Sequence, residues 1–201
     1  MTRNFILNRL SNECMHELIA YLNIIKPLSP AIIERIKKIF KLRKFVKSSF
    51  VLREGDQSDP VIFVLSGLLR YYKIERSSEV SKCFLQRHDI LINGTGIAAG
   101  VPSSGFMQAL INTEVLICPK LELDYLYIDF PEFEHHGRIL TQLSYIRVYA
   151  VLDNIRMRTA RERYQFLQRE FPGLVLAVPN KHLASYLGIN KITLSRIRSI
   201  R

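Results

Sequence analysis

The sequence contains no tryptophan and only three cysteines, nine glycines and eight prolines among its 201 residues. The cysteines are odd in number and form no CxxC pair, which excludes a disulfide-rich miniprotein, so we expect reduced thiols. The low glycine and proline content excludes collagen-like and low-complexity chains. No apolar run approaches the roughly 18 residues that span a bilayer, and the charged N-terminal segment lacks the apolar core of a secretory signal. We therefore expect a cytoplasmic protein without a membrane partner.

Acidic residues are also scarce, with 18 Asp and Glu against 29 Lys and Arg, a net charge of +11. The imbalance is concentrated near the end of the chain: residues 147–201 contain eleven basic and three acidic side chains, which gives +8. The last 31 residues contain no acid. A charge excess clustered in this way is typical of a protein with a polyanionic partner, and it favours nucleic acid over a uniformly solvated surface.

The first part of the chain combines two helices with many short strands. Residues 14–25 have apolar side chains at helical spacing, and Ser29-Pro30 is typical of the start of a second helix. Short β-rich runs separated by turn residues then follow, at 49–52, 61–65, 68–74, 83–86, 89–91 and 109–118. This pattern predicts a small antiparallel β-barrel or cupin-like jelly roll.

A long helix is predicted from residue 133 to about residue 155. Ile139, Leu143, Ile146 and Ala150 recur at steps of 4, 3 and 4, the seam of a helix that packs against another long helix. This stripe can alternatively lie on the barrel of its own chain. A second copy of the same helix explains so long an element better, so we expect a homodimer with these four residues at its interface.

We expect three parts: N-terminal helices and a β-barrel in residues 1–130, a dimerisation helix in 131–156, and a DNA-binding domain in 157–201. An amphipathic segment, 159–171, precedes Pro172-Gly173, where we expect the helix to stop and a hinge to form.

Residues 180–200 have the spacing of a helix-turn-helix. Counted from Asn180, the fifth position is Ala184 and the ninth is Gly188. A small residue allows two helices to cross closely, and glycine permits the positive φ of a tight turn. Asn190 can cap the second helix. The alternative, an unspecialised helical hairpin, does not explain this combination of residues.

The outward face of the second helix is predicted to contact DNA. Arg196 is our first candidate for a base contact, because an arginine can form two hydrogen bonds to guanine in the major groove. Lys181, Thr193 and Arg198 are better suited to phosphate. The predicted DNA-binding residues are Lys181, Asn190, Lys191, Ile192, Thr193, Ser195, Arg196, Arg198 and Ser199.

A barrel, a long dimerising helix and a helix-turn-helix in this order resemble the Crp/Fnr superfamily of bacterial transcription regulators. Residues 52–56 (Leu-Arg-Glu-Gly-Asp) and 62–70 (Ile-Phe-Val-Leu-Ser-Gly-Leu-Leu-Arg) are similar to the family's paired strand motifs. Residues 183–189 and 193–198 are similar to its recognition motif, which is the more specific match. The resemblance implies an α+β fold in which a cyclic-nucleotide-binding-like β domain senses an effector and is coupled through dimer helices to promoter binding.

The expected effector site departs from the pattern of cyclic-nucleotide-binding members. The corresponding residues, 89–109, contain no arginine and no glutamate, and Ser103 and Ser104 stand where the family has an Arg-Ser pair. Without that charge, cyclic AMP is not the expected ligand. Glycine amides can still cradle an anion, although loop glycines are more often turn formers. The candidate effector-pocket residues are Gly94, Gly96, Gly100, Ser103 and Ser104.

Other cofactors and an enzyme are not expected. Cys14 is the single cysteine near the N-terminus, which argues against an iron-sulfur cluster, and one imidazole, His88, is a weak case for heme. The chain has no HxH, HExxH, GxSxG or Walker pattern, and we expect no metal site.

The sequence therefore predicts a homodimeric, sequence-specific transcription regulator that binds double-stranded DNA at a pseudo-palindromic operator with half-sites roughly 34 Å apart. RNA polymerase and an unidentified small-molecule effector are further candidate partners. Ile192 stands where well-known relatives have a base-reading glutamate, so their operator is not expected here. The alternatives are a small-molecule or nucleotide-binding sensor module that acts through a protein partner, and a barrel enzyme.

Overall fold

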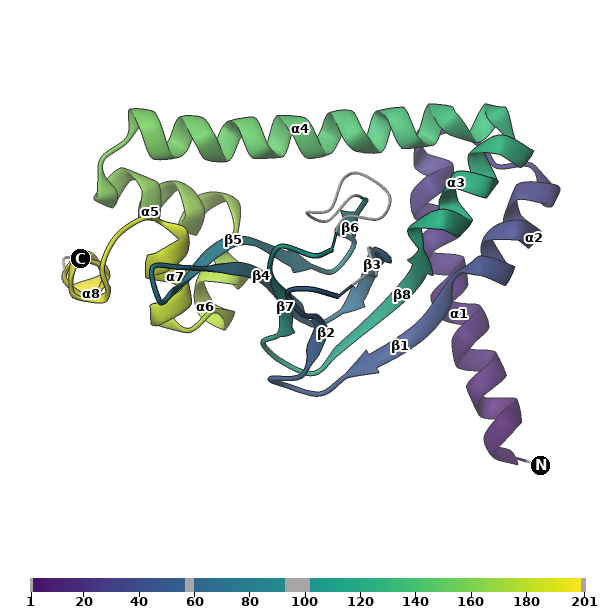
Figure 1. Ribbon diagram of the computed structural model, residues 1–201, viewed down its shortest axis with the longest axis horizontal. Coiled ribbons are helices and arrows are strands. Elements are labelled where there is room, and N and C mark those ends of the chain that lie inside the picture. Colours follow the sequence, from purple (N-terminus) through teal and green to yellow (C-terminus); the bar gives the residue numbers. More distant parts are fainter. Residues whose placement is uncertain (1, 57–59, 93–101, 200–201) are drawn as a thin grey trace.

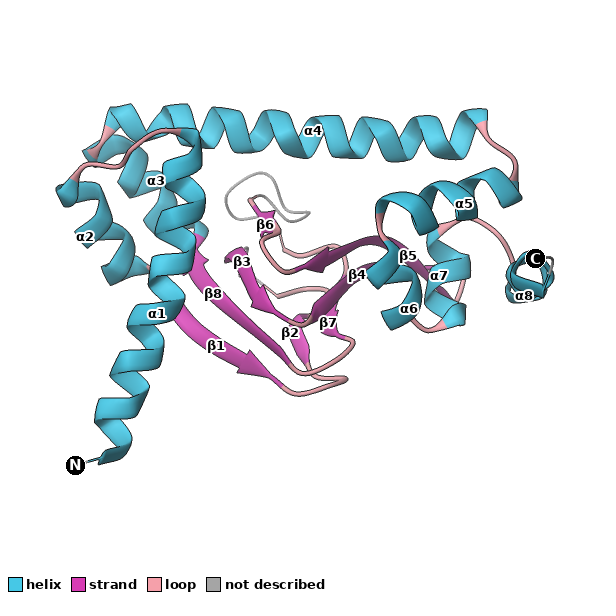
Figure 2. Cartoon of the chain, turned by 180° about the vertical axis from the view of Figure 1, so that it is seen from behind, coloured by secondary structure: helices cyan, strands magenta, loops and turns pink. Residues whose placement is uncertain are grey.

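The computed structural model describes residues 2–56, 60–92 and 102–199, which form helices and two antiparallel sheets (Figures 1 and 2). The predicted α+β class is confirmed. The helices are α1 (Thr2–Ile25), α2 (Pro30–Ile39), α3 (Lys120–Asp129), α4 (Glu134–Met157), α5 (Ala160–Glu170), α6 (Pro172–Ala177), α7 (Asn180–Tyr186) and α8 (Lys191–Ser199), and a 3₁₀ turn (Pro131–Phe133) precedes α4. The strands are β1 (Lys41–Phe45), β2 (Phe50–Leu52), β3 (Pro60–Ser66), β4 (Leu68–Glu75), β5 (Ser78–Gln86), β6 (Ile90–Leu91), β7 (Phe106–Ala109) and β8 (Thr113–Pro119).

The two sheets have the strand orders β1-β8-β3-β6 and β2-β7-β4-β5. Side chains from both sheets share one buried core, which includes Val64, Leu69, Met107 and Val115. This core forms because alternate side chains of each strand point toward the opposite sheet, and those side chains are apolar. This two-sheet arrangement agrees with the predicted jelly roll.

Two sequence-based strand assignments need correction. The apolar run at residues 109–118 was predicted as one strand, but it divides at an exposed turn, Ile111-Asn112, into β7 of one sheet and β8 of the other. Strand β1 was not predicted, because basic residues at Lys41, Arg43 and Lys44 interrupt the apolar pattern on its exposed face.

The turn between β3 and β4 requires glycine at position 67. Gly67 has φ +96°, and a Cβ atom there would lie 2.6 Å from Thr113 Cα and 2.7 Å from Asn112 O. We expect Gly67→Ala to lower the free energy of unfolding by about 2–5 kcal/mol, through backbone strain and the clash together. Gly55→Ala is the matched control, since Gly55 has φ +87° with open space around it. It should cost only the strain of about 1–2 kcal/mol. Equal losses in chemical denaturation would contradict this account.

Three helices cover one sheet at its outer face, at the right of Figure 1. Apolar residues of α1, α2 and α3, among them Leu18, Ile36 and Leu126, pack with Phe63 of β3 in one cluster. Helix α2 begins as predicted, because Ser29 Oγ accepts a hydrogen bond from Ile32 N and proline occupies the first turn.

Helix α4 extends along the whole upper side of the molecule in Figure 1, over both the sheets and the C-terminal helices. The predicted long helix is therefore confirmed. Its buried residues are His136, Leu140 and Asn154, which recur on one face. On this same face Arg147 Nη1 donates to Asp89 Oδ1 at 2.5 Å.

The C-terminal helices α5 to α8 pack around a second hydrophobic cluster. Helix α5 starts with a capping box between Thr159 and Glu162. Helix α5 ends at Glu170, so the predicted helix stop before Pro172 is confirmed, and Pro172 then opens α6, since a proline fits the first turn of a helix. The core of this cluster includes residues of the β domain, Leu68 and Phe84, so the two parts share buried surface.

Candidate nucleic-acid interface

Helices α7 and α8 are joined by a tight turn whose residues match the predicted roles. Gly188 has φ +67°, its N–H bonds to Ser185 O at 3.2 Å, and the next N–H, of Ile189, bonds to Ala184 O at 3.0 Å. These two bonds define a Schellman motif, which ends α7. Asn190 Oδ1 then accepts from Thr193 N at 2.7 Å and caps α8, as predicted.

The two faces of α8 differ in burial. Leu194 is fully buried in the C-terminal cluster, together with Ala184 of α7, so the small residue lies at the helix crossing as predicted. The opposite face is exposed, and Ile192 is 66% exposed. Thr193 is half-buried; the exposed predicted residues of this helix and its cap are Asn190, Lys191, Ile192, Ser195, Arg196 and Ser199.

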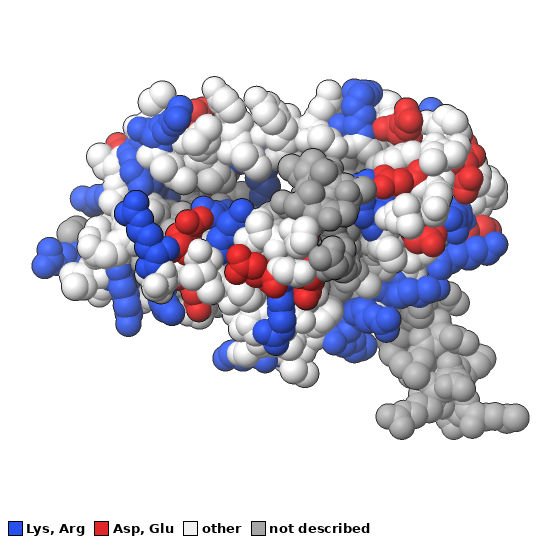
Figure 3. Space-filling view, viewed as in Figure 1, with Lys and Arg blue, Asp and Glu red and all other residues white. Residues whose placement is uncertain are grey.

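Positive charge surrounds this exposed face. Figures 1 and 2 place α8 at the end of the molecule opposite α2, and Figure 3 shows Lys and Arg side chains around that end. Lys181 at the start of α7 is exposed, and its Nζ lies 3.9 Å from Glu79 Oε2, so an acid of the β domain partly balances it. Lys191 and Arg196 make no ion pair within the described part of the chain, which leaves their charge available to a ligand.

Arg198, a predicted phosphate contact, is engaged in contacts within the chain. Its guanidinium donates to Val175 O at 2.9 Å and to Asn180 Oδ1, and it lies over the ring of Tyr164. These contacts tie α8 to α5, α6 and α7, so we assign Arg198 to the support of the interface and no longer to a phosphate contact. The local sequence does not distinguish Arg198 from Arg196, which is two residues earlier and exposed.

Helix α7 docks on strand β5 through polar contacts that sequence reasoning missed. Ser185 Oγ accepts from Ser81 N and donates to Glu79 O, both at 3.0 Å. Beneath them, the fully buried Arg70 donates to Ser81 Oγ at 2.8 Å and to Glu79 Oε2 at 2.7 Å. An arginine inside the apolar run of β4 was the one available signal, because a buried charge needs a partner.

His182 of α7 is expected to make the stability of the protein depend on pH. Burial, and then the charge of Arg70, lower the pKa of His182 below its ordinary value, against the opposing effect of Glu79. The unfolded state therefore binds a proton more readily than the folded state, so this contribution to stability is present above about pH 6.5 and is lost as the pH falls below it. We expect lower thermal stability at pH 5.5 than at pH 7.5 in calorimetry, and a smaller difference in His182→Gln. If His16→Gln, at an exposed histidine, reduced the difference equally, the assignment would be wrong.

Of the predicted effector residues, Ser103 and Ser104 lie in the described part of the chain. Gly94, Gly96 and Gly100 lie outside the described residues. Ser103 is buried, and its backbone exchanges hydrogen bonds with Gly55 and Asp56, while its Oγ donates to Gly105 O at 2.9 Å. These contacts give Ser103 a structural role in holding the loop after β2, and Ser104 beside it is half-buried.

The predicted dimer residues lie on α4 beside its buried face. Ile139 is half-buried, whereas Leu143 and Ile146 are 51% and 62% exposed and Ala150 is also exposed. Further apolar residues of the same helix are exposed as well: Tyr145, Val148, Tyr149, Leu152, Ile155 and Met157. This amount of exposed apolar surface on one helix is typical of an interaction site.

Three further observations concern metal ions, cysteines and membrane spans. Among the described residues, no three His, Cys, Asp or Glu side chains lie where they can share a metal ion. Cys14, Cys83 and Cys118 are free thiols, as predicted. None of the helices in the described part of the chain is long and apolar enough to cross a bilayer.

The fold is shared with solved structures that include a regulator of the Crp/Fnr family. FixK2 from Bradyrhizobium japonicum is 20% identical, with a TM-score of 0.68 over 80% of this chain and 83% of that chain. A regulator of the Crp/Fnr family from Eubacterium rectale is 18% identical, with a TM-score of 0.67 over 85% and 82%. CLP, a c-di-GMP responsive global regulator from Xanthomonas campestris, is 13% identical, with a TM-score of 0.66 over 85% and 90%.

At these identities the similarity establishes the fold. The fold that the sequence resemblance implied, that of the Crp/Fnr regulators, is therefore confirmed. No protein-family model matches the sequence, and no curated protein matches it either.

Proposed function

We propose that the protein is a homodimeric transcription regulator of the Crp/Fnr type that binds DNA in a sequence-specific manner through α7 and α8. The observation that carries this proposal is the exposed, acid-free face of α8, which follows a Schellman turn and is held by the buried Leu194. The fold shared with Crp/Fnr regulators supports it independently. The corresponding division is a sensor part in residues 1–130, a dimerisation helix in 131–156 and a DNA-binding part in 157–201.

In this proposal α8 enters the major groove with its exposed face toward the bases. Arg196 is assigned to a base, because it is exposed and makes no ion pair among the described residues. Lys191, Thr193 and Lys181 are assigned to phosphates, which fix the register of the helix but carry no sequence information. The remaining predicted contacts, Asn190, Ile192, Ser195 and Ser199, complete the surface that faces the groove.

The second copy of the chain is assigned to the exposed apolar side of α4. A twofold axis along paired α4 helices would place two α8 helices on one side of the dimer, and this arrangement requires a pseudo-palindromic operator. The β domain is proposed to sense an effector other than cyclic AMP, since the arginine that would pair with the cyclic phosphate is absent from residues 89–109. Contact with RNA polymerase belongs to the same proposal.

The test is selection of binding sites from a random library of duplex DNA by the purified full-length protein. We expect enrichment of two inverted half-sites with centres about one helical turn apart. Enrichment should weaken steeply with salt, because phosphate contacts release counterions. A selection that enriches no motif, with and without added cell extract as a source of effector, would overturn the proposal in favour of a sensor that acts through a protein.

A further inference from the structure

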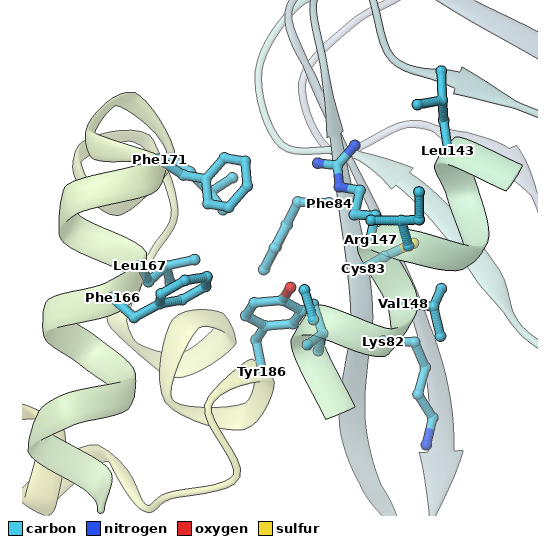
Figure 4. A pocket seen from close by; sticks show the side chains of 14 residues that line it. Lys82, Cys83, Phe84, Leu143, Arg147, Val148, Phe166, Leu167, Phe171 and Tyr186 are labelled. Carbon is cyan, nitrogen blue, oxygen red and sulfur yellow. The ribbon is translucent and has the colours of Figure 1, made fainter. Parts of the chain in front are cut away.

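A cavity of about 320 Å³ lies where β5, α4, α5 and α7 meet (Figure 4). Aromatic rings face it from three elements: Phe84 of β5, Phe166 of α5 and Tyr186 of α7. Val151 and its neighbours on α4 form the remaining wall. Small-molecule sites typically occupy about 300–1,000 Å³ and have apolar walls with a few polar groups. The cavity has the size and lining of such a site.

The polar groups at the wall are mostly hydrogen-bond donors. Arg147 uses one N–H for Asp89, and the guanidinium makes no second hydrogen bond within the described residues, so its other N–H groups are available. The hydroxyl of Tyr186 points into the cavity, and burial raises the pKa of Tyr186 to about 12, which keeps the proton in place. Burial likewise raises the pKa of Cys83 to about 11, so this thiol is neutral.

The wall offers hydrogen-bond donors to an anionic group. Arg147 is paired with Asp89, which does not itself line the cavity, and Lys82 is exposed, with its ammonium group directed away from the cavity in Figure 4. A carboxylate accepts hydrogen bonds from a guanidinium and from a phenol, whereas an ammonium group would meet only donors. The flat rings of the wall match a flat aromatic body, which can pack against their faces and edges.

The cavity also touches each moving part of the proposed regulator. Its walls include the sensor strand β5, the dimer helix α4 and the first helix of the DNA-binding pair, α7. Leu143, Ile146 and Ala150 belong both to this wall and to the predicted dimer seam. The affinity of a ligand that contacts all these elements depends on their relative positions. Such a ligand therefore increases the population of the arrangement that it binds more tightly.

We propose that this cavity binds a small aromatic monocarboxylate, held at its carboxylate by Arg147 and Tyr186, and that its occupancy controls the position of α7 relative to β5. The binding part stands on the cavity alone. The regulatory part rests on the proposed DNA-binding function.

The experiment is isothermal titration calorimetry of the full-length protein with 2-naphthoate. We expect saturable binding of one molecule per chain with a dissociation constant below about 1 mM. The uncharged 2-naphthamide has nearly the same shape and should bind roughly tenfold more weakly or worse, because it lacks the charge-assisted hydrogen bonds. Tyr186→Phe keeps the ring that packs on Phe84 and should weaken 2-naphthoate between about twofold and tenfold.

Two tryptophan variants locate the site. Val151→Trp places a large ring into the cavity and should abolish binding, while Leu152→Trp, the next residue on α4, does not line the cavity and should leave binding intact. Both variants should retain the circular dichroism spectrum of the wild type. If they lost binding equally, the ligand would lie on the outer side of α4, and the cavity assignment would be wrong.

Three further results would overturn the binding part: no saturable binding to the wild type, equal affinity for the amide, and undiminished binding to Val151→Trp. The regulatory part is tested by adding saturating 2-naphthoate to the operator-binding assay, where we expect a shift in affinity of at least about threefold that Val151→Trp does not show. Operator binding without a shift would overturn the regulatory part alone. A protein that binds 2-naphthoate but no DNA sequence would overturn the proposed function and leave the ligand site standing.

Discussion

Replacing Ile146 by aspartate should convert the proposed dimer into a monomer and weaken binding to the proposed operator by a factor of about 10²–10⁴, the usual gain from linking two binding modules. Ile146 lies in the predicted seam of α4 and is 62% exposed within one chain. In the monomer the new carboxylate stays in water, whereas in the dimer it would be buried against an apolar partner helix at high cost. Sedimentation velocity and fluorescence anisotropy with a labelled operator measure the two effects.

The control for this variant is Ile128→Asp in α3. Ile128 is 71% exposed and lies outside α4, so the same substitution should leave the dimer intact. The control should keep the midpoint of unfolding of the wild type, whereas Ile146→Asp should lower it, because association stabilises the folded state. A dimer that survives Ile146→Asp would mean that the two copies meet through a different surface.

Replacing Arg196 by alanine should remove most of the sequence specificity. A bidentate contact to guanine discriminates by about 1–3 kcal/mol, and a symmetric dimer makes it twice. The expected loss on the selected operator is therefore about 2–6 kcal/mol, or roughly 30-fold to more than 10⁴-fold. On scrambled duplex DNA the loss should be small, since Arg196 is assigned to a base and not to a phosphate. Anisotropy titrations at one fixed salt concentration compare the two DNAs.

Arg169→Ala supplies the matched control, because it removes the same charge from an exposed side chain of α5 that is paired with Glu170. Arg169→Ala should weaken binding to the operator and to scrambled DNA equally and slightly. Lys191→Ala, at an assigned phosphate contact, should weaken binding to both DNAs and lower the salt dependence by about one unit for each half-site. If Arg196→Ala behaved like Lys191→Ala, the base contact would have to be assigned to another residue of α8.

Much of the fold could be predicted because its helices begin and end by local rules. Ser29 before Pro30 caps α2, and the combination of Ala184, Gly188 and Asn190 defines α7, its turn and the start of α8. Each of these features depends on residues within about one helical turn of one another. Pro172 obeys a local rule as well: α5 ends before it, as predicted, and the same proline opens α6, a short helix that was not predicted.

The parts that could not be predicted depend on contacts between distant segments. Ser185 and Ser81 are 104 positions apart, and the buried Arg70 donates to Ser81 Oγ and pairs with Glu79, whose side chain is 34% exposed. The outward appearance of Arg198 in the sequence was misleading for the same reason, since its partner Val175 is 23 residues away. Assigning pairs at such separations requires the packing of α7 on β5, which no local pattern records.

The docking of α7 on β5 also decides how the DNA-binding part can move. Leu68 and Phe84 of the β domain are buried in the same cluster as Leu183 and Leu194. A small displacement of α7 would therefore open a void beside these side chains before water could fill it, and the serine contacts at Ser185 would be broken without replacement. Intermediate positions are the least favourable ones, so the DNA-binding part is expected to change position in a single cooperative step, with two well-separated states and no continuous range between them.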